Sequence, residues 1–337
     1  MMTADLPSPH RPSARPTRRG RDALVMGGLA LLFLGGLIGL AAATGWRETL
    51  AQIARLHIWQ IAALLALSLV NYTFRAARWH IFARALGLGT GFLQNTRHYL
   101  GGFAMIVTPA RVGELVRMRW ITRETGWSFD RAMPLVLMDR AGDLAAMALI
   151  LALALSLAAT GVAGAVPVAL AALAVAAVAT RPRLLAAIAT WGHRATGRFA
   201  RLFARLRRAA RSLTRFSDPR VLFAAIALGC IGWLAEAWGF HLLLVWMGAD
   251  IGLWKAVAIF VFATLAGGLT GAPGGVGGAE AAMIALLTLD GVPLDAAVAA
   301  TAIIRLTTLW FALLLGLAIF PFAERISLKG RHALENR

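Results

Sequence analysis

The chain has 337 residues, of which 59% are apolar and only 15% are charged. Soluble domains lie closer to half apolar and a quarter charged, so this composition predicts an all-α polytopic membrane protein. The 34 basic residues outnumber the 16 acidic ones, but they gather between apolar stretches, as membrane orientation requires, and nucleic acid is not a predicted partner. A single cysteine, Cys230, excludes an internal disulfide and argues against a cysteine-based metal site, and no cofactor is predicted.

In chain order, residues 1–22 form a basic tail rich in proline that is predicted to be disordered and cytoplasmic. An uncharged run at 23–44 predicts the first membrane helix. Further apolar spans are expected at 56–74, 132–159, 162–180, 221–247, 253–271 and 296–322. The pieces at 99–108 and 279–289 are too short to cross a bilayer and are predicted to be halves of broken or re-entrant helices, giving about six to eight spans in all.

The segment from Arg181 to Arg220 contains eleven arginines and one acid. Between 183 and 217 the arginines recur every three or four residues, with phenylalanine and leucine on the opposite face. This pattern predicts an amphipathic helix on the cytoplasmic leaflet, which either anchors the protein or recruits the transported lipid.

Two interrupted apolar segments repeat one pattern. Residues 108–114 read TPARVGE and residues 272–280 read APGGVGGAE, with proline, valine, glycine and glutamate in the same order. The acid and arginine that follow the first break also match those that follow the second: Asp130 and Arg140, then Asp295 and Arg305. The sequence therefore predicts two repeats, at about 56–159 and 221–322, and paired breaks of this kind indicate a transport site.

The charges around the two breaks differ in sign. The loops around the first carry many arginines: Arg75, Arg78, Arg84, Arg97, Arg117, Arg119 and Arg123. Those around the second are mainly acidic: Asp250, Asp290 and Asp295, against Lys255. We therefore expect the breaks to enter from opposite sides, so that the repeats are inverted, with 162–180 as the extra crossing and both termini, including a tail at 326–337, in the cytoplasm.

Several ions lie within apolar spans, where each costs about 3 kcal/mol at the bilayer centre. Asp139, Arg140 and Asp143 can share one helical face and form either a salt bridge that locks helices or a substrate or proton site. Arg305 has no acid nearby in sequence, so its partner is another helix or an anionic ligand. Glu236 is either a packed, protonated acid or a functional one.

The breaks also supply backbone donors. Thr108 before Pro109 is typical of a helix N-terminus, whose free N–H groups favour an anion, although close-packing kinks remain the alternative. The predicted substrate-binding residues are Pro109, Arg111, Gly113, Arg140, Pro273, Gly274, Gly275 and Arg305. The candidate proton carriers are Glu114, Asp139, Asp143 and Glu280. We find no Walker A motif that would couple ATP.

Five elements in order resemble the lysylphosphatidylglycerol synthase transmembrane region family of flippase-like proteins. They are Arg78-Trp79, Thr108 to Glu114, the Asp139-Arg140-Asp143 group, Pro273 to Glu280, and Arg305. The resemblance covers about residues 20–325. Asp139 stands where glutamate is commoner, and Gly277-Gly278-Ala279 lengthens the fourth element, which weakens the equivalence of Glu280.

The resemblance implies a membrane region that moves aminoacylated phosphatidylglycerol between leaflets, while an attached soluble domain makes that lipid. Because this chain ends at Arg337, shortly after the transmembrane domain predicted at 23–325, we expect a stand-alone flippase-like form that is not an enzyme. The predicted function is transport of an anionic or modified (glyco)lipid across the bacterial inner membrane, with membrane lipids as partners.

Two alternatives stay open. One is a membrane-embedded lipid-linked glycosyl- or acyltransferase, although the predicted outside loop at 45–57 offers only Glu48 as an acid. The other is a non-transporting partner of a lipid-synthesis enzyme.

Overall fold

The computed structural model describes residues 56–106, 112–158, 165–181, 218–270 and 273–335, together with a few isolated positions. Within these ranges the regular structure is helical and contains no strand, which confirms the predicted all-α class. The predicted tail at 1–22, the predicted helix at 23–44 and nearly all of the basic helix at 183–217 lie outside the described residues.

The first half begins with a long helix and then a short one that stops inside the molecule. Its elements are α3 (Ile58–Leu86), α4 (Phe92–Gly101), a 3₁₀ turn (Gly102–Met105), α5 (Val112–Thr125) and α6 (Phe129–Leu157). The Ser128 side chain accepts a hydrogen bond from the Arg131 N–H group and so caps the start of α6. A further helix, α7 (Ala165–Thr180), packs along α6.

The second half repeats this order of elements. They are α10 (Pro219–Trp246), α11 (Leu253–Leu269), a 3₁₀ turn (Pro273–Gly275), α12 (Gly278–Leu289), α13 (Leu294–Arg305), a π-helical stretch (Leu306–Trp310) and α14 (Phe311–Glu335). Asp218 accepts a hydrogen bond from the Arg220 N–H group, and Pro219 follows it at the first helical position, so the start of α10 is fixed locally.

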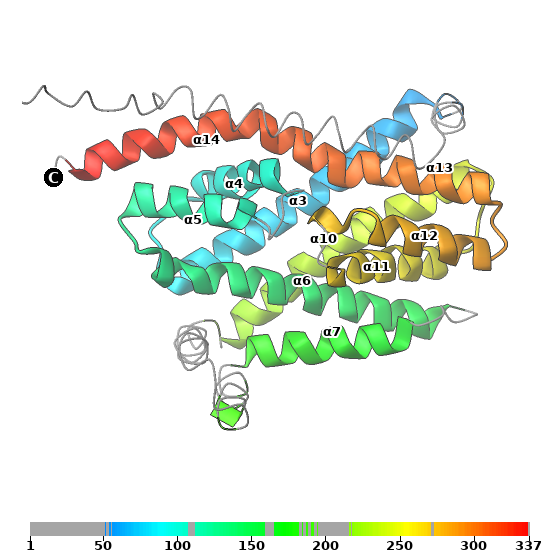
Figure 1. Ribbon diagram of the computed structural model, residues 1–337, viewed down its shortest axis with the longest axis horizontal. Coiled ribbons are helices and arrows are strands. Elements are labelled where there is room, and N and C mark those ends of the chain that lie inside the picture. The colour runs from blue at the N-terminus through cyan, green and yellow to red at the C-terminus, as the bar shows by residue number, and fades with distance from the viewer. Residues whose placement is uncertain are drawn as a thin grey trace, which may run out of the picture.

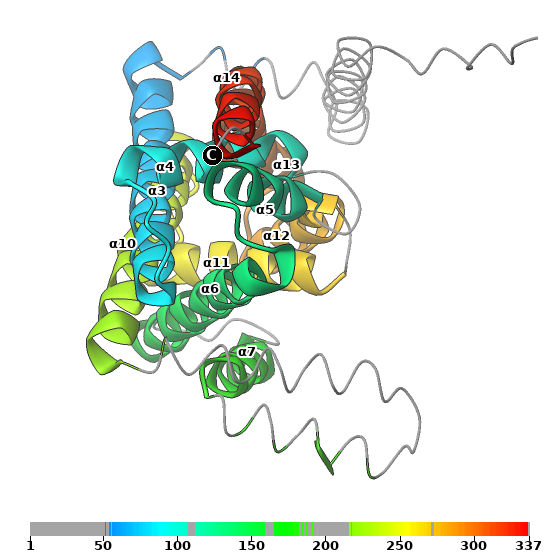
Figure 2. The same cartoon turned by 90° about the vertical axis from the view of Figure 1, so that its left-hand side faces the viewer.

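The two halves run in opposite directions (Figures 1 and 2). Helices α3 and α10 make the most extensive helix–helix contact in the described chain and are antiparallel, and α6 likewise runs against α13 and α14. Helices α4 and α11 start from opposite ends of the molecule and both stop inside it (Figure 1). This opposite direction of equivalent elements is what an inverted repeat requires.

The lengths of the helices fit a multi-pass membrane protein. Three stretches of the described chain are both long and apolar enough to cross a bilayer: Phe129–Leu157, Pro219–Trp246 and Leu294–Gly330. Shorter apolar helices occur at Ala165–Ala174, Leu253–Gly268 and Gly278–Leu289. The main core lies between α6, α7, α10, α11 and α13, and a second core lies between α3, the α4–α5 segment and the start of α6.

Two boundaries in the sequence analysis were wrong. The second span was predicted to end at residue 74, whereas α3 continues to Leu86, so Arg75 and Arg78 lie inside a buried helix and not in a loop. Hydropathy misplaced this boundary because it counts each cation at full cost, while acids from another helix neutralise these two. The last helix also exceeds its predicted end at 322, since α14 continues through most of the predicted tail at 326–337.

A wide turn interrupts the last long helix between α13 and α14. In the π-helical stretch, the Thr307 carbonyl oxygen accepts a hydrogen bond from the Ser68 hydroxyl at 2.8 Å. The Thr308 carbonyl oxygen accepts one from the Tyr72 hydroxyl at 2.6 Å. Side chains of α3 thus bind carbonyl groups at the point where the regular helical pattern is broken.

Candidate functional site

A buried cluster of ions joins α3 to α6. The Arg75 Nη2 atom lies 2.7 Å from Asp143 Oδ2, and Arg78 Nη2 lies 2.6 Å from Asp139 Oδ1 and 2.8 Å from Asp143 Oδ1. The two arginines are three residues apart and the two acids four apart, so each pair occupies one face of its helix. The cluster therefore consists of two facing rows, each from one helix.

Helix α10 completes this cluster. The indole N–H group of Trp233 donates a hydrogen bond to Asp143 Oδ1 at 3.1 Å, and the Arg75 guanidinium lies 4.8 Å from the centre of the Trp233 ring. Gly229, one helical turn earlier, leaves room for Arg78, because a Cβ atom there would lie 3.0 Å from Arg78 Nη1 and 2.9 Å from the Ala146 Cβ atom. Three helices thus hold a fully buried arginine.

Arg140 is the most accessible arginine of the cluster. Its guanidinium lies 3.3 Å from Asp139 Oδ2 and 3.5 Å from Asp143 Oδ2, both longer than the contacts made by Arg75 and Arg78. Its side chain is 30% exposed, whereas that of Arg78 is 0% exposed. Because stronger partners already hold both acids, Arg140 is the cation of this cluster best placed to contact a ligand.

The second half carries a simpler ion pair at its break. Arg305 Nε lies 2.5 Å from Glu280 Oε1, and Arg305 Nη2 donates a hydrogen bond to the Gly274 carbonyl oxygen at 3.0 Å. The other oxygen of Glu280 accepts a hydrogen bond from the Gly277 N–H group at 2.7 Å. One arginine and one acid therefore hold the loop and the start of α12 together.

Glycines are required at this break for two reasons. Gly274, Gly275 and Gly277 have φ angles of 63°, 69° and 86°, in the left-handed region that residues with a Cβ atom rarely adopt. In addition, a Cβ atom on Gly278 would lie 2.6 Å from the Thr270 Cγ2 atom and 3.3 Å from the Gly267 Cα atom of α11. The repeated glycines thus serve both backbone conformation and close packing, so the close-packing interpretation holds for part of the motif.

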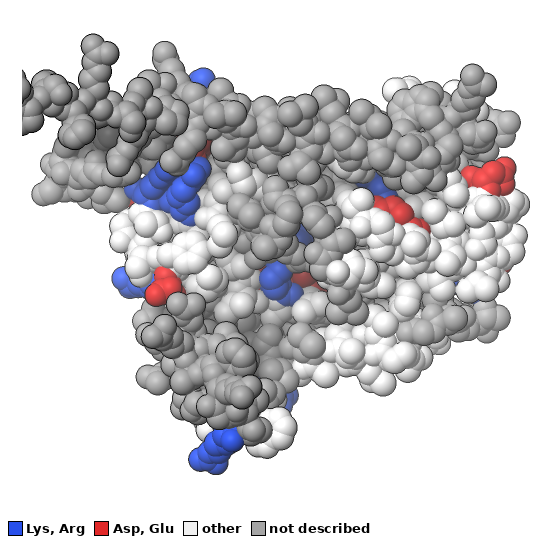
Figure 3. Space-filling view, in the orientation of Figure 1, with Lys and Arg blue, Asp and Glu red and all other residues white. Residues whose placement is uncertain are grey.

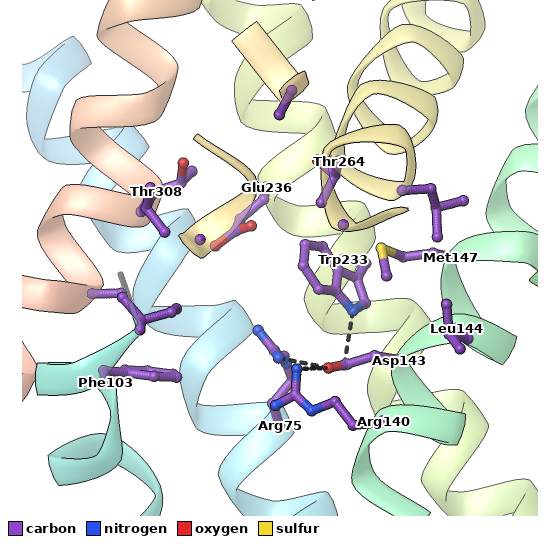
Figure 4. Close-up of a pocket in the computed structure, with 18 of the residues that line it drawn as sticks. Arg75, Phe103, Arg140, Asp143, Leu144, Met147, Trp233, Glu236, Thr264 and Thr308 are labelled. Atoms are coloured by element: carbon purple, nitrogen blue, oxygen red, sulfur yellow. Dashed lines mark hydrogen bonds and ion pairs between the residues drawn. The ribbon is translucent and has the colours of Figure 1, made fainter. Parts of the chain in front are cut away.

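A cavity of about 460 Å³ lies between the two halves. The ion cluster borders it through Arg75, Arg140 and Asp143, and the second break borders it through Gly274, Gly275 and Arg305. Figure 4 shows Arg75, Arg140 and Asp143 on one side of this space, with Glu236, Thr264 and Thr308 on the other. Apolar side chains complete the wall: Phe103, Met105, Ile106, Leu144, Met147, Val168, Phe260, Leu265 and Leu309.

Arg117 reaches the same cavity from α5. Its guanidinium lies 4.2 Å from the centre of the Tyr99 ring and 5.4 Å from that of Trp79, both within cation–π distance. It passes directly over Gly102, where a Cβ atom would lie 2.2 Å from Arg117 Nε. The sequence analysis assigned Arg117 to a loop, whereas the side chain is buried among aromatic rings.

A second group of ions lies at the end of the molecule where α5 and α14 meet. Glu324 Oε1 lies 2.6 Å from Arg123 Nη1, and Glu324 Oε2 lies 2.6 Å from Arg119 Nη2. The Trp120 indole N–H group donates a hydrogen bond to Glu324 Oε2 at 2.7 Å. None of these side chains lines the cavity, and the group fixes α5 against α14.

The predicted site residues are distributed as follows. Arg140, Asp143, Gly274, Gly275 and Arg305 line the cavity, while Asp139 and Glu280 stand behind it as ion-pair partners. Pro109 and Arg111 lie outside the described residues, as do the side chains of Gly113, Glu114 and Pro273.

The sequence analysis did not select Arg75, Arg78, Arg117 or Trp233 as site residues. A usable signal was present in the spacing of Arg75 and Arg78, which matches one face of a helix and complements the two acids at 139 and 143. In the described part of the chain, no group of three or more histidine, cysteine or acidic side chains could hold a metal ion.

These features define a class of protein: a multi-pass α-helical membrane protein of two opposed halves with a charged cavity between them. The chain belongs to the lysylphosphatidylglycerol synthase TM region family, which matches residues 25–316. This finding confirms the resemblance drawn from the five motif elements.

Two UPF0104 membrane proteins of Methanothermobacter thermautotrophicus are similar to the chain. One is 30% identical over 105 residues, which is 31% of each protein, and the other is 32% identical over 110 residues, which is 33% of this chain and 32% of the relative. The chain thus matches about a third of the length of each relative.

Proposed function

We propose that this protein moves lipids with an anionic headgroup between the leaflets of the bacterial inner membrane. The observation that carries the proposal is the cavity between the two halves, which the side chains of Arg75, Arg140 and Arg305 line within a predominantly apolar helical protein. Ionisable side chains at such depth are costly and commonly mark a substrate pathway.

The size and charge of the cavity support a headgroup as the ligand. A volume of about 460 Å³ falls in the range of small-molecule sites, which is about 300–1,000 Å³. Such a space holds a polar headgroup, while the acyl chains stay in apolar surroundings. Among the described residues at and behind the cavity, the arginines outnumber the acids by five to four, so at least one positive charge is in excess: Arg75, Arg78, Arg117, Arg140 and Arg305 against Asp139, Asp143, Glu236 and Glu280.

Surface charge supports the orientation that we propose, with both termini in the cytoplasm. Basic side chains gather at the end of the molecule formed by α4 and α5 (Figure 3). Arg97 lies on α4, and Arg119 and Arg123 lie on α5. The opposite end carries Asp250 and Asp290. Excess arginine marks the cytoplasmic side of membrane proteins.

The test is transbilayer movement of a fluorescent phosphatidylglycerol in proteoliposomes that contain the purified protein, followed by chemical quenching of the outer leaflet. We expect the wild-type protein to accelerate movement and Arg140→Ala to slow it by about 10- to 100-fold, since a hydrogen bond to a charged group contributes about 1.5–3 kcal/mol. Arg131→Ala is the control, because Arg131 lies over Trp127, away from the cavity.

Two outcomes would overturn the proposal. Equal rates for the wild-type protein and Arg140→Ala would remove the cavity as the lipid pathway. Formation of a glycosylated or acylated lipid by the purified protein, without transbilayer movement, would establish the enzyme alternative instead.

A further inference from the structure

Glu236 differs from the other acids that surround the cavity. It lies on α10, lines the cavity and is only 5% exposed. Asp139, Asp143 and Glu280 each have an arginine nitrogen within 2.8 Å. Within the described part of the chain, Glu236 forms neither a hydrogen bond nor an ion pair. It is therefore a nearly buried carboxyl group that faces an internal space without a partner.

The polar side chains seen beside this acid in Figure 4 offer it no donor. Figure 4 shows Glu236 between Thr308 and Thr264, with Trp233 beside them. The Thr308 hydroxyl donates to the Ile304 carbonyl oxygen at 2.6 Å, and the Thr264 hydroxyl donates to that of Phe260 at 2.8 Å. The Trp233 N–H group donates to Asp143. The hydroxyl oxygens of Thr264 and Thr308 are therefore left as hydrogen-bond acceptors, which suit a protonated carboxyl group as the donor.

The charged and titratable groups that face Glu236 already bind other partners. Tyr72 and Arg75 face it from α3, Asp143 from α6 and Arg305 from α13. The Tyr72 hydroxyl donates to the Thr308 carbonyl oxygen, Arg75 binds Asp143, and Arg305 binds Glu280. Each cation within reach therefore has its own acid at short distance.

We infer that Glu236 is a proton-binding site that couples lipid movement to a proton gradient, an inference that rests on the proposed transport function. A buried carboxylate without a partner is costly, whereas the neutral acid is not, and its O–H group can donate to the acceptor oxygens around it. The proton comes from water on one side of the membrane, binds a carboxylate oxygen, and returns to water on the other side, so no other reactant is needed.

The structure thus favours a different proton carrier from those predicted from sequence. Asp139, Asp143 and Glu280 are each held in an ion pair with an arginine. The side chain of Glu114 lies outside the described residues. Among the described acids at and behind the cavity, Glu236 is the one that no ion pair holds.

The experiment compares lipid movement with and without an imposed pH gradient across proteoliposomes that contain the full-length protein. If one proton moves with each lipid, one pH unit shifts the transbilayer distribution of a fluorescent phosphatidylglycerol by up to about tenfold. For Glu236→Gln, we expect the lipid distribution to be about the same with and without the gradient. Asp295→Asn is the matched control, because it neutralises an exposed acid in the first turn of α13 and keeps the response.

A second measurement separates this inference from the proposed function. Infrared difference spectra of the purified protein across a pH titration should contain the carbonyl band of a protonated carboxylic acid, and Glu236→Gln should lack it. The inference is overturned, and transport left intact, if lipid movement by the wild-type protein does not respond to the gradient. It is also overturned if Glu236→Gln keeps the response. If only Glu236→Gln moves no lipid, the infrared band decides, and its presence in that variant overturns the inference. If the wild-type protein moves no lipid, the proposed function fails and the coupling falls with it, while the band still reports whether Glu236 binds a proton.

Discussion

The two halves of this molecule satisfy their buried arginines in different ways. In the first half, three arginines share two acids, and the contacts join α3, α6 and α10. In the second half, one arginine holds one acid at the break between α11 and α12. The first arrangement connects helices that are distant in sequence, whereas the second fixes a local loop. A repeated sequence pattern can therefore mark both a site that joins helices and one that shapes a break.

The largest expected effect tests the shared cluster. Replacing Arg78 by alanine leaves Asp139 and Asp143 short of a cation in a fully buried place. Breaking a buried pair in this way costs about 3–5 kcal/mol. We expect a large fall in the melting temperature of the detergent-solubilised protein, with partial rescue by Arg78→Lys. A variant that melts with the wild-type protein would show that the cluster does not stabilise the helix arrangement.

The next effect tests whether the second pair is an isolated unit. Glu280→Gln keeps an oxygen that can accept from the Gly277 N–H group, so it removes mainly the ion pair with Arg305. In a double-mutant cycle with Arg305→Met, we expect a coupling energy of about 0.5–3 kcal/mol in thermal unfolding. Combining either change with Asp143→Asn should give additive effects. Non-additivity there would mean that the two halves form one network.

A smaller effect tests the space for Arg78. Gly229→Ala places a methyl group against Arg78 and Ala146, and such overpacking costs about 1–3 kcal/mol. Gly239→Ala in the same helix meets only side-chain carbons at ordinary contact distance, so it is expected to be neutral or slightly stabilising. Melting curves of both variants provide the measurement. The same stability for both would remove close packing as the reason for Gly229.

The smallest effect separates binding from stability. Arg140 is part-exposed, and its two acids keep Arg75 and Arg78 as partners when it is removed. We therefore expect Arg140→Ala to change the unfolding free energy by no more than about 1 kcal/mol, as for exposed ion pairs. Thermal unfolding in detergent measures this. A loss as large as that of Arg78→Ala would make Arg140 a structural residue of the cluster.

Much of the fold could be predicted from sequence because apolar spans and breaks are local signals. The short helix predicted at 279–289 is α12, and the long span predicted at 132–159 is α6. The partners of the ions could not be predicted in the same way. The spacing of Asp139 and Asp143 shows that they share a face, but not that α3 supplies the opposing cations.

The misplaced end of α3 has the same origin. Hydropathy along one segment treats Arg75 and Arg78 as solvated, and only contact with α6 makes their burial tolerable. Glu236, Thr264 and Thr308 likewise lie side by side only because α10, α11 and the π-helical stretch pack together (Figure 4). Single residues such as Arg140 and Arg305 could be selected from sequence because an ion in an apolar span is conspicuous without knowledge of its neighbours.

The π-helical stretch has a geometric consequence for the whole last helix. A π turn contains one residue more than an α turn, so it shifts the angular phase of everything that follows by about 100°. Glu324 lies nineteen positions after Arg305. With one residue absorbed by the wide turn, eighteen regular steps remain, which is about five full turns. Arg305 and Glu324 therefore point to the same side of this last long helix. Arg305 pairs there with Glu280 of α12, and Glu324 pairs with Arg123 of α5. Deleting one residue between 306 and 310 would close the wide turn to a regular one and leave eighteen steps, so the two side chains would stay on the same side, whereas deleting a residue after 310 would rotate Glu324 away by about 100°.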